Sequence, residues 1–302
     1  MDLAQRLLSM LLTVWLAVTL VFFMLRILPG DAVGAQLAQS GASRNDIEQM
    51  RAQLGLDDSI FTQYARFMTD LAQGDLGDSL ANRYPVNQLI AERFRPTALL
   101  AATTIVVAVI GGITLGIAGA FDSFLSMIAR LVITLSISTP IYWTGTLAIA
   151  LFSAELRWLP SSGTGRWENL VLPVGVLAFH TMGGIARVTQ ANIADIRQAP
   201  FVWVARSKGL SERQIVWRHI LQVGLLPVVT VIALQMGFLL SGAVITESLF
   251  VRPGIGRLLL DSAIRQDYAV VQGIVVLAAL VYITLNTLAE GIYRLIDPRI
   301  AV

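Results

Sequence analysis

Five basic or titratable side chains fall within fourteen residues of an otherwise apolar chain: Arg206, Lys208, Arg213, Arg218 and His219. Lys208 is the only lysine in the sequence. A nucleotide-binding loop needs the order Gly-Lys-Ser/Thr, so that backbone amides and the lysine hold the phosphates. Here the lysine stands in Ser-Lys-Gly, which is the wrong order. The cluster is therefore not predicted to bind ATP, and its chemistry is that of a protein or membrane contact.

The residues around these cations predict two short helices joined at a stiff corner. Pro200 suits the first turn of a helix. Gly209 suits a left-handed cap after Lys208. Ser211 and Gln214 form a capping box that starts the second helix. We expect a helix, a glycine break and a second helix.

Two interpretations of this corner stay open. It is either an ordinary positively charged cytoplasmic loop, with Trp203 and Trp217 anchoring at the lipid headgroups, or a rigid element that docks on a cytoplasmic partner. Pro227 is expected to bend the second helix as it enters the membrane.

Polar side chains inside apolar runs are the other candidate functional residues. Glu247 lies at the end of one run, where a carboxylate is costly. We expect either a structural ion pair with Arg252 or Arg257, or a role as a substrate gate. His180 and Gln235 are interpreted either as hydrogen-bonded contacts between helices or as lining of a translocation path.

Several catalytic classes are excluded or disfavoured by composition. The chain has no cysteine and only two histidines, which rules out thiolate chemistry and a multi-histidine metal site. Ser161 and Ser162 have no base nearby in sequence, and a serine hydrolase is not favoured. A net charge of +2 gives no reason to expect nucleic-acid binding.

The elements that must position these residues are membrane helices. The chain is 55% hydrophobic and 14% charged, with a mean hydropathy of +0.69, against about 25% charged residues in soluble domains. Six uncharged runs approach or exceed the roughly 18 residues that cross a bilayer. They are Leu7–Leu25, Thr97–Phe121, Leu131–Ala154, Asn169–Ala186, Ile220–Thr246 and Tyr268–Ala289. The first run is longer than a signal-peptide core, so we expect a retained span.

The distribution of arginine predicts the orientation of these spans. Residues 187–219 carry six Arg or Lys, and the tail adds Arg294 and Arg299. The positive-inside rule places both regions, and both termini, in the cytoplasm. We expect a first transmembrane helix (1–28), an extracytoplasmic helical segment (29–95), a core of five spans (96–293) with a cytoplasmic loop (198–219), and a cytoplasmic tail (294–302).

The extracytoplasmic segment is expected to contain three short helices. A capping box of Ser43 and Asp46 starts the first, which ends near Gly55. Asp57, Asp58 and Ser59 can cap the second, which ends near Gly74. The third starts after Pro85 and ends at Pro96, where the next span begins. Gly112 and Gly116 form a GxxxG motif that allows another helix to approach closely.

Spaced motifs give the chain a family resemblance. ARSKGLSERQIVWRHILQVGLLPVVTV (205–231) resembles the cytoplasmic loop signature of permease subunits of bacterial ABC importers, in the dipeptide, oligopeptide and nickel branch. Further similar motifs run in order along the chain: LPGD (28–31), LGLDDSIFTQY (54–64), GDLGDS (74–79), WLPSSG (158–163), ITESLFVRPGIGRLLLDSAIRQDYAVVQG (245–273) and DPRI (297–300).

The resemblance implies an all-α, type I ABC permease fold in the bacterial cytoplasmic membrane. It implies four kinds of contact: a second related permease, two ATP-binding subunits that hold ATP and Mg, an extracytoplasmic solute-binding protein and the lipid bilayer. The chain itself would hold no cofactor and no metal and would not be an enzyme. The ATPase coupling contact would comprise Ala205, Arg206, Ser207, Lys208, Gly209, Leu210 and Arg213.

The substrate is less constrained than the class of protein. The resemblance implies import of a small peptide or related polar solute, with nickel or a metal chelate as the alternative. A secondary transporter is disfavoured, because such proteins often show internal repeats and a charged residue at the membrane midplane. Neither feature is found in this sequence.

Overall fold

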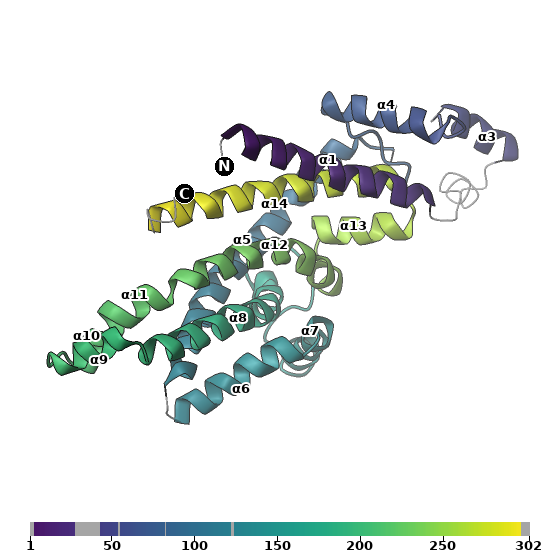
Figure 1. Cartoon of the computed structure of the whole chain (residues 1–302). Helices are drawn as coiled ribbons and strands as arrows, with labels where there is room; N and C mark the ends of the chain where they lie inside the picture. Colours follow the sequence, from purple (N-terminus) through teal and green to yellow (C-terminus); the bar gives the residue numbers. More distant parts are fainter. Residues whose placement is uncertain (1–2, 28–42, 54, 82, 122–123, 297–302) are drawn as a thin grey trace. The chain divides into compact units, whose positions relative to one another are not determined.

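The computed structural model describes residues 3–27, 43–53, 55–81, 83–121 and 124–296 (Figure 1). Within them every regular element is a helix, apart from one isolated bridge between Asp78 and Pro85. In this part of the chain four helices are long and apolar enough to cross a membrane, and two bent helix pairs raise the number to six if each pair is one span. The expected all-helical membrane fold is confirmed. The motifs at 28–31 and 297–300 lie outside the described residues.

The chain divides into two compact units. One contains residues 1–95 and 253–283, and the other contains residues 96–252 and 284–302. The long helices α5 (Val86–Ala120) and α14 (Tyr268–Ile296) each contribute residues to both units.

Aromatic side chains hold the first membrane helix to the extracytoplasmic segment in the first unit. Phe22 of α1 (Leu3–Ile27) is fully buried and stacks on Phe67 of α4 (Ile60–Ala72), with ring centroids 5.4 Å apart. The Arg26 guanidinium lies 3.5 Å from the centre of the Phe22 ring and donates to Gln63 Oε1 at 3.0 Å. Tyr64 bonds Thr19 through their hydroxyls at 2.7 Å. These contacts fix α4 along α1.

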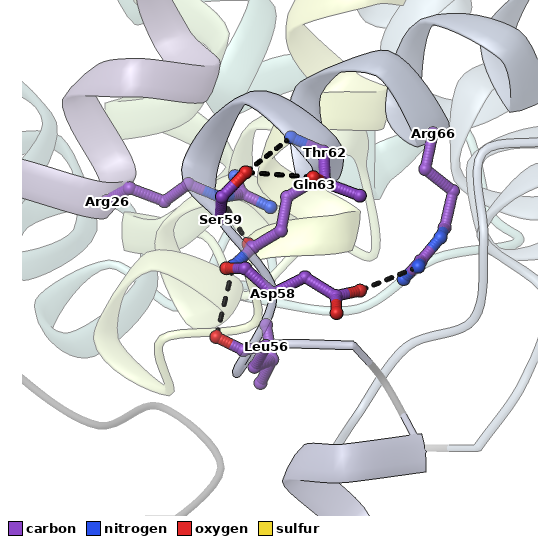
Figure 2. A network of polar contacts seen from close by, with 7 residues as sticks. All are labelled: Arg26, Leu56, Asp58, Ser59, Thr62, Gln63 and Arg66. Carbon is purple, nitrogen blue, oxygen red and sulfur yellow. Dashed lines mark hydrogen bonds and ion pairs between the residues drawn. The ribbon is translucent and has the colours of Figure 1, made fainter.

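The start of α4 is capped by Ser59, one of the three cap candidates in the sequence. The Ser59 hydroxyl accepts from the Thr62 amide, and Gln63 donates back to the carbonyls of Leu56 and Asp58 (Figure 2). Asp58 pairs with Arg66 at 2.7 Å. The preceding helix, α3 (Arg44–Gln53), begins directly after Ser43. Left-handed glycines follow both helices, at Gly55 (φ 63°) and Gly74 (φ 78°).

A second cluster in this unit packs α13 (Ile255–Ile264) with the starts of α5 and α14. Its buried members include Val86, Ile90 and Val270. A Cβ added at Gly273 would lie 2.6 Å from the Val86 side chain. Glycine at this position therefore lets α14 approach α5 closely.

The helix α8 (Glu168–Arg197) is central to the second unit, and α6 (Phe124–Ser138), α7 (Ile141–Ala148) and α12 (Leu226–Leu249) pack against it (Figure 1). The GxxxG motif of α5 faces this helix. A Cβ at Gly112 would lie 2.8 Å from Ile185, and one at Gly116 would collide with Thr189. The motif thus serves close packing within this chain.

The sequence prediction that a helix ends at Pro96 was wrong. Pro96 does not end a helix, because α5 continues through it from Val86 to Ala120. Proline's fixed φ is compatible with a helix, and its cost is the lost hydrogen bond from position 96 together with crowding of the ring against the carbonyl four residues earlier. The predicted span Leu131–Ala154 falls on a pair of helices that together are long and apolar enough to be one bent span. It bends by 109° between α6 and α7, and α7 continues as a π-helix, η1 (Ile149–Glu155). Pro140 lies at the break.

Candidate functional site

The basic corner is built as the sequence predicted. Pro200 opens α9 (Pro200–Ser207), and Gly209 has φ 77° just beyond it. The Gly209 amide donates to the Arg206 carbonyl at 2.9 Å, and the Leu210 amide donates to the Ala205 carbonyl at 3.3 Å. This is the pattern of a Schellman cap, which needs a left-handed residue at the glycine position. The corner between the helices is thereby fixed by backbone hydrogen bonds.

The second helix of the corner begins with the predicted capping box. The Gln214 amide donates to Ser211 Oγ at 3.4 Å, and the Ser211 amide donates to Gln214 Oε1 at 3.2 Å. The helix runs through α10 (Glu212–Ile215), the π-helix η2 (Val216–Ile220) and α11 (Leu221–Gly224). It then bends by 48° into α12, whose first turn contains Pro227. The predicted bend is confirmed.

An apolar underside seats the corner on the rest of its unit. Val202 and Ile215 are fully buried and cluster with Ile193 of α8. Ala205 is 5% exposed and belongs to the same cluster. Of the residues predicted to contact an ATPase, Ala205 therefore faces the core and supports the others from below.

Arg206 acts as a brace across the corner. Its guanidinium makes two hydrogen bonds to the Glu212 carboxylate, at 2.7 and 3.2 Å. This pairing raises the pKa of Arg206, with hydrogen bonding as the larger cause and charge attraction as a further one. The guanidinium also lies 5.7 Å from the centre of the Trp203 ring. Because Arg206 lies in α9 and Glu212 in α10, their ion pair joins the two helices.

The outer face of the corner is both basic and apolar. Ser207, Lys208, Gly209, Leu210 and Arg213 are exposed. Within the described part of the chain, the side chains of Lys208 and Arg213 make no hydrogen bond or ion pair. Large apolar side chains are also exposed: Phe201, Trp203, Val204 and Trp217. Free cations beside exposed aromatic rings suit contact with an acidic protein surface or with lipid headgroups.

Glu247 is fully buried at the end of α12 and accepts a hydrogen bond from the Thr97 hydroxyl of α5 at 2.5 Å. Arg252 is 4% exposed and donates to the Asn169 carbonyl at 3.3 Å. Burial lowers the pKa of Arg252, and attraction to Glu247 opposes this shift. The hydrogen bond from Thr97 gives the buried carboxylate a structural partner, and both the ion pair and the role of Glu247 as a gate stay predictions.

The turn that holds Arg252 near Glu247 is strained. Val251 has φ 53°, a left-handed conformation that costs a residue with a Cβ about 1–2 kcal/mol. The Arg252 amide donates a hydrogen bond to the Glu247 carbonyl at 2.8 Å, which caps the C-terminus of α12. The same hydrogen-bond pattern that ends α9 with glycine at position 209 ends α12 with valine at position 251.

Gln235 and His180 join helices in the second unit. Gln235 Nε2 lies 3.4 Å from the Thr181 carbonyl of α8, and a Cβ at Gly184 would collide with this amide. His180 contacts Thr144 Oγ1 at 2.7 Å and the Ser136 carbonyl at 2.9 Å. Whether either residue lines a path stays a prediction.

Sequence reasoning missed the role of Asp267. This carboxylate is 1% exposed, and it accepts from Ser79 Oγ at 2.5 Å and from the amides of Leu80 and Ala81. It ties the 74–85 loop to the start of α14. The two partners are 188 residues apart in sequence, and no local pattern could have joined them.

No metal site accompanies these contacts in the described residues, where no three His, Asp or Glu side chains gather as ligands. The described residues thus form a polytopic membrane protein with buried polar contacts between its helices and a stiff basic corner between α9 and α10. Residues 112–302 match the family described as "binding-protein-dependent transport system inner membrane component", and residues 2–101 match its N-terminal companion. The chain belongs to this family and is a permease subunit of an ABC importer of the dipeptide and oligopeptide branch.

Named relatives match nearly the whole chain. The glutathione transport system permease protein GsiC of Escherichia coli O6:H1 is 38% identical over 298 residues, which cover 98% of this chain and 97% of that protein. The protein of the same name from Salmonella paratyphi A is 37% identical over the same shares. The family is a transport component and not an enzyme, and it resides in the inner membrane.

Solved structures agree on the fold. A structure of the MetNI methionine ABC transporter aligns with a TM-score of 0.59 at 14% identity, covering 70% of this chain and 97% of that one. An amino acid ABC transporter aligns with a TM-score of 0.53 at 15% identity, covering 71% and 95%. Membership in the family implies that ATP is bound by separate ATPase subunits and that a binding protein delivers the solute.

Proposed function

We propose that this permease imports a small peptide of the glutathione type, as one of two related permeases served by two ATPase subunits. The observation that carries the substrate class is its 38% identity, over 98% of the chain, to a permease named for glutathione transport. A binding protein on the outer side would select the solute, and this chain would form part of its pathway. Nucleotide-driven movement of the ATPases would switch the pathway between two states.

The coupling contact in this proposal is the basic corner. Lys208, Gly209, Leu210 and Arg213 would touch the ATPase, because they are exposed on one corner. Ser207 would flank the contact, and Arg206 would brace it through Glu212. A contact that transmits movement must not flex, and the two capping motifs and the ion pair supply this stiffness.

The orientation follows from the same contact. A corner that docks on ATPases lies in the cytoplasm, which agrees with the six basic residues between positions 187 and 219. With six spans, both termini would then be cytoplasmic, and residues 29–95 would lie outside.

Uptake by intact cells tests the substrate. The gene for this chain is removed from its host, and uptake of radiolabelled glutathione is measured with and without a plasmid copy. We expect loss and recovery of energy-dependent uptake, and competition by excess unlabelled glutathione. Full uptake in the deleted strain, or competition by Ni²⁺ but not by glutathione, would overturn the proposed substrate. A plasmid copy with Lys208→Glu tests the coupling role independently of the substrate. It should lower uptake of whichever solute the importer carries.

A further inference from the structure

The 109° break between α6 and α7 removes a backbone hydrogen bond within an apolar helix pair. In a continuous helix the Ser136 carbonyl would accept from the amide of residue 140. Residue 140 is proline and has no amide hydrogen. The preceding amide, that of Thr139, cannot replace it, because it donates to the Leu135 carbonyl at 3.1 Å. Since an unpaired carbonyl in a membrane costs several kcal/mol, the Ser136 carbonyl needs a donor from elsewhere.

His180 of α8 supplies this donor. Its Nδ1 lies 2.9 Å from the Ser136 carbonyl oxygen. A carbonyl only accepts, so Nδ1 must carry the hydrogen, and in a neutral ring Nε2 is then an acceptor. Nε2 lies 2.7 Å from Thr144 Oγ1, which can donate to it. The imidazole therefore contacts α6 on one nitrogen and α7 on the other, across the break.

The surrounding packing brings α8 close enough for this bridge. A Cβ at Gly183 would collide with Ser136 Oγ, and it would lie 2.9 Å from Ile137 Cγ1. Glycine at 183 thus lets the break rest against α8 three residues beyond the histidine. The ring of Phe179 stands edge-on to the imidazole, with centroids 5.3 Å apart, and fixes its plane.

We propose that His180 is a positioning residue that replaces the hydrogen bond lost at Pro140 and thereby sets the angle between α6 and α7. In this proposal the imidazole of His180 compensates for the missing amide hydrogen of Pro140. It does so without any contact to a transported solute. The proposal does not depend on the identity of the solute or on the ATPase contact.

Replacements of His180 test the hydrogen bonds of its two ring nitrogens separately. Asparagine places an amide nitrogen near the position of Nδ1, and glutamine places one near Nε2. His180→Asn should therefore keep the bond to Ser136, and His180→Gln should lose it. His180→Leu removes both bonds while keeping an apolar side chain of similar volume.

The angle can be followed with spin labels, because the chain has no native cysteine. Cysteines are introduced at Met127 of α6 and Leu151 of η1, which are 71% and 50% exposed. The full-length protein is purified from membranes with the subunits it carries and is placed in lipid nanodiscs. Pulsed dipolar spectroscopy then gives the distribution of distances between the two labels.

We expect His180→Asn to keep the narrow parent distribution, and both His180→Gln and His180→Leu to shift or broaden it. Pro140→Ala restores a backbone amide, so in that background His180→Leu should cause little further change. Equal behaviour of the Asn and Gln variants would overturn the proposal. So would an unchanged distribution for His180→Leu, or an effect of His180→Leu that persists in full beside Pro140→Ala.

Discussion

Replacing Gly209 by valine should weaken the contact with the ATPase without unfolding the protein. Gly209 has φ 77°, and no atom lies within 4 Å of the position a Cβ would take. The side chain therefore has room, and the cost is that of the left-handed backbone alone. That cost is about 1–2 kcal/mol for a residue with a Cβ.

This magnitude fixes the expected change in affinity. If the corner must be left-handed to dock, 1–2 kcal/mol corresponds to roughly a 5- to 30-fold loss of affinity, since about 1.4 kcal/mol is tenfold. Val251 shows that this chain tolerates a left-handed valine (φ 53°) where buried contacts hold the turn. At the exposed Gly209 the added side chain meets no neighbouring atom, so we expect the backbone strain to distort the cap of the corner locally instead of unfolding the protein.

The assay is binding of the purified ATPase subunits to the permease in nanodiscs, measured as an apparent Kd. Gly74→Val is the matched control. Gly74 also follows the C-terminus of a helix, has φ 78° and has no atom within 4 Å of an added Cβ. It carries the same strain in the extracytoplasmic segment. Unchanged affinity in a well-expressed Gly209→Val protein, or an equal loss in both variants, would refute the reasoning.

Other changes test the charge and packing of the second unit. Lys208→Glu should weaken ATPase binding more at low salt than at high salt, because screening removes the effect of an exposed charge; a binding constant equal to the parent's at low salt would contradict this. Thr97→Val removes the donor to the buried Glu247 and should lower the free energy of unfolding by about 1–3 kcal/mol, whereas Thr103→Val, whose hydroxyl bonds only its own helix, should have a small effect in the same denaturation assay. Gly116→Leu should destabilise the protein by about 1–3 kcal/mol or more through overpacking against α8, and a melting temperature equal to the parent's would count against that close contact.

Local chemistry explains the parts that sequence predicted well. The corner was predictable because Pro200, Gly209, Ser211 and Gln214 each act within four residues of their own position, where backbone geometry and capping decide the structure. The cap at Ser59 was predictable for the same reason. The membrane helices were predictable because an apolar run of sufficient length has few alternatives in a bilayer.

The errors arose where the effect of a proline depends on tertiary context. Pro96 was expected to end a helix, and it lies inside α5. Pro140 was not expected to break a span, yet the chain bends by 109° there. The two prolines have the same local effect on the backbone. At Pro140 a side chain from another helix, His180 of α8, contacts the residues on both sides of the break, and such a partner is not visible in local sequence.

The contacts of the buried polar residues were also beyond sequence reasoning. Glu247 and Arg252 could be proposed as an ion pair because they are five residues apart, and that pairing stays a prediction. Thr97 and Asn169, which hold them, are 150 and 83 residues distant from their partners. Asp267 and Ser79 are separated still further. Such pairs depend on the packing of whole helices.

Site-directed crosslinking at the corner tests the central claim most directly. The chain lacks cysteine, so a single cysteine in place of Lys208 can carry a photoactivatable crosslinker in native membranes, and crosslinked partners can be identified by mass spectrometry. A cysteine at the exposed Arg265, in the first unit, is the control. We predict that position 208 captures a subunit with a nucleotide-binding P-loop and that position 265 does not. Capture of lipid alone at position 208, with intact ATPase present in the same membranes, would contradict the coupling role and leave the corner as a membrane anchor.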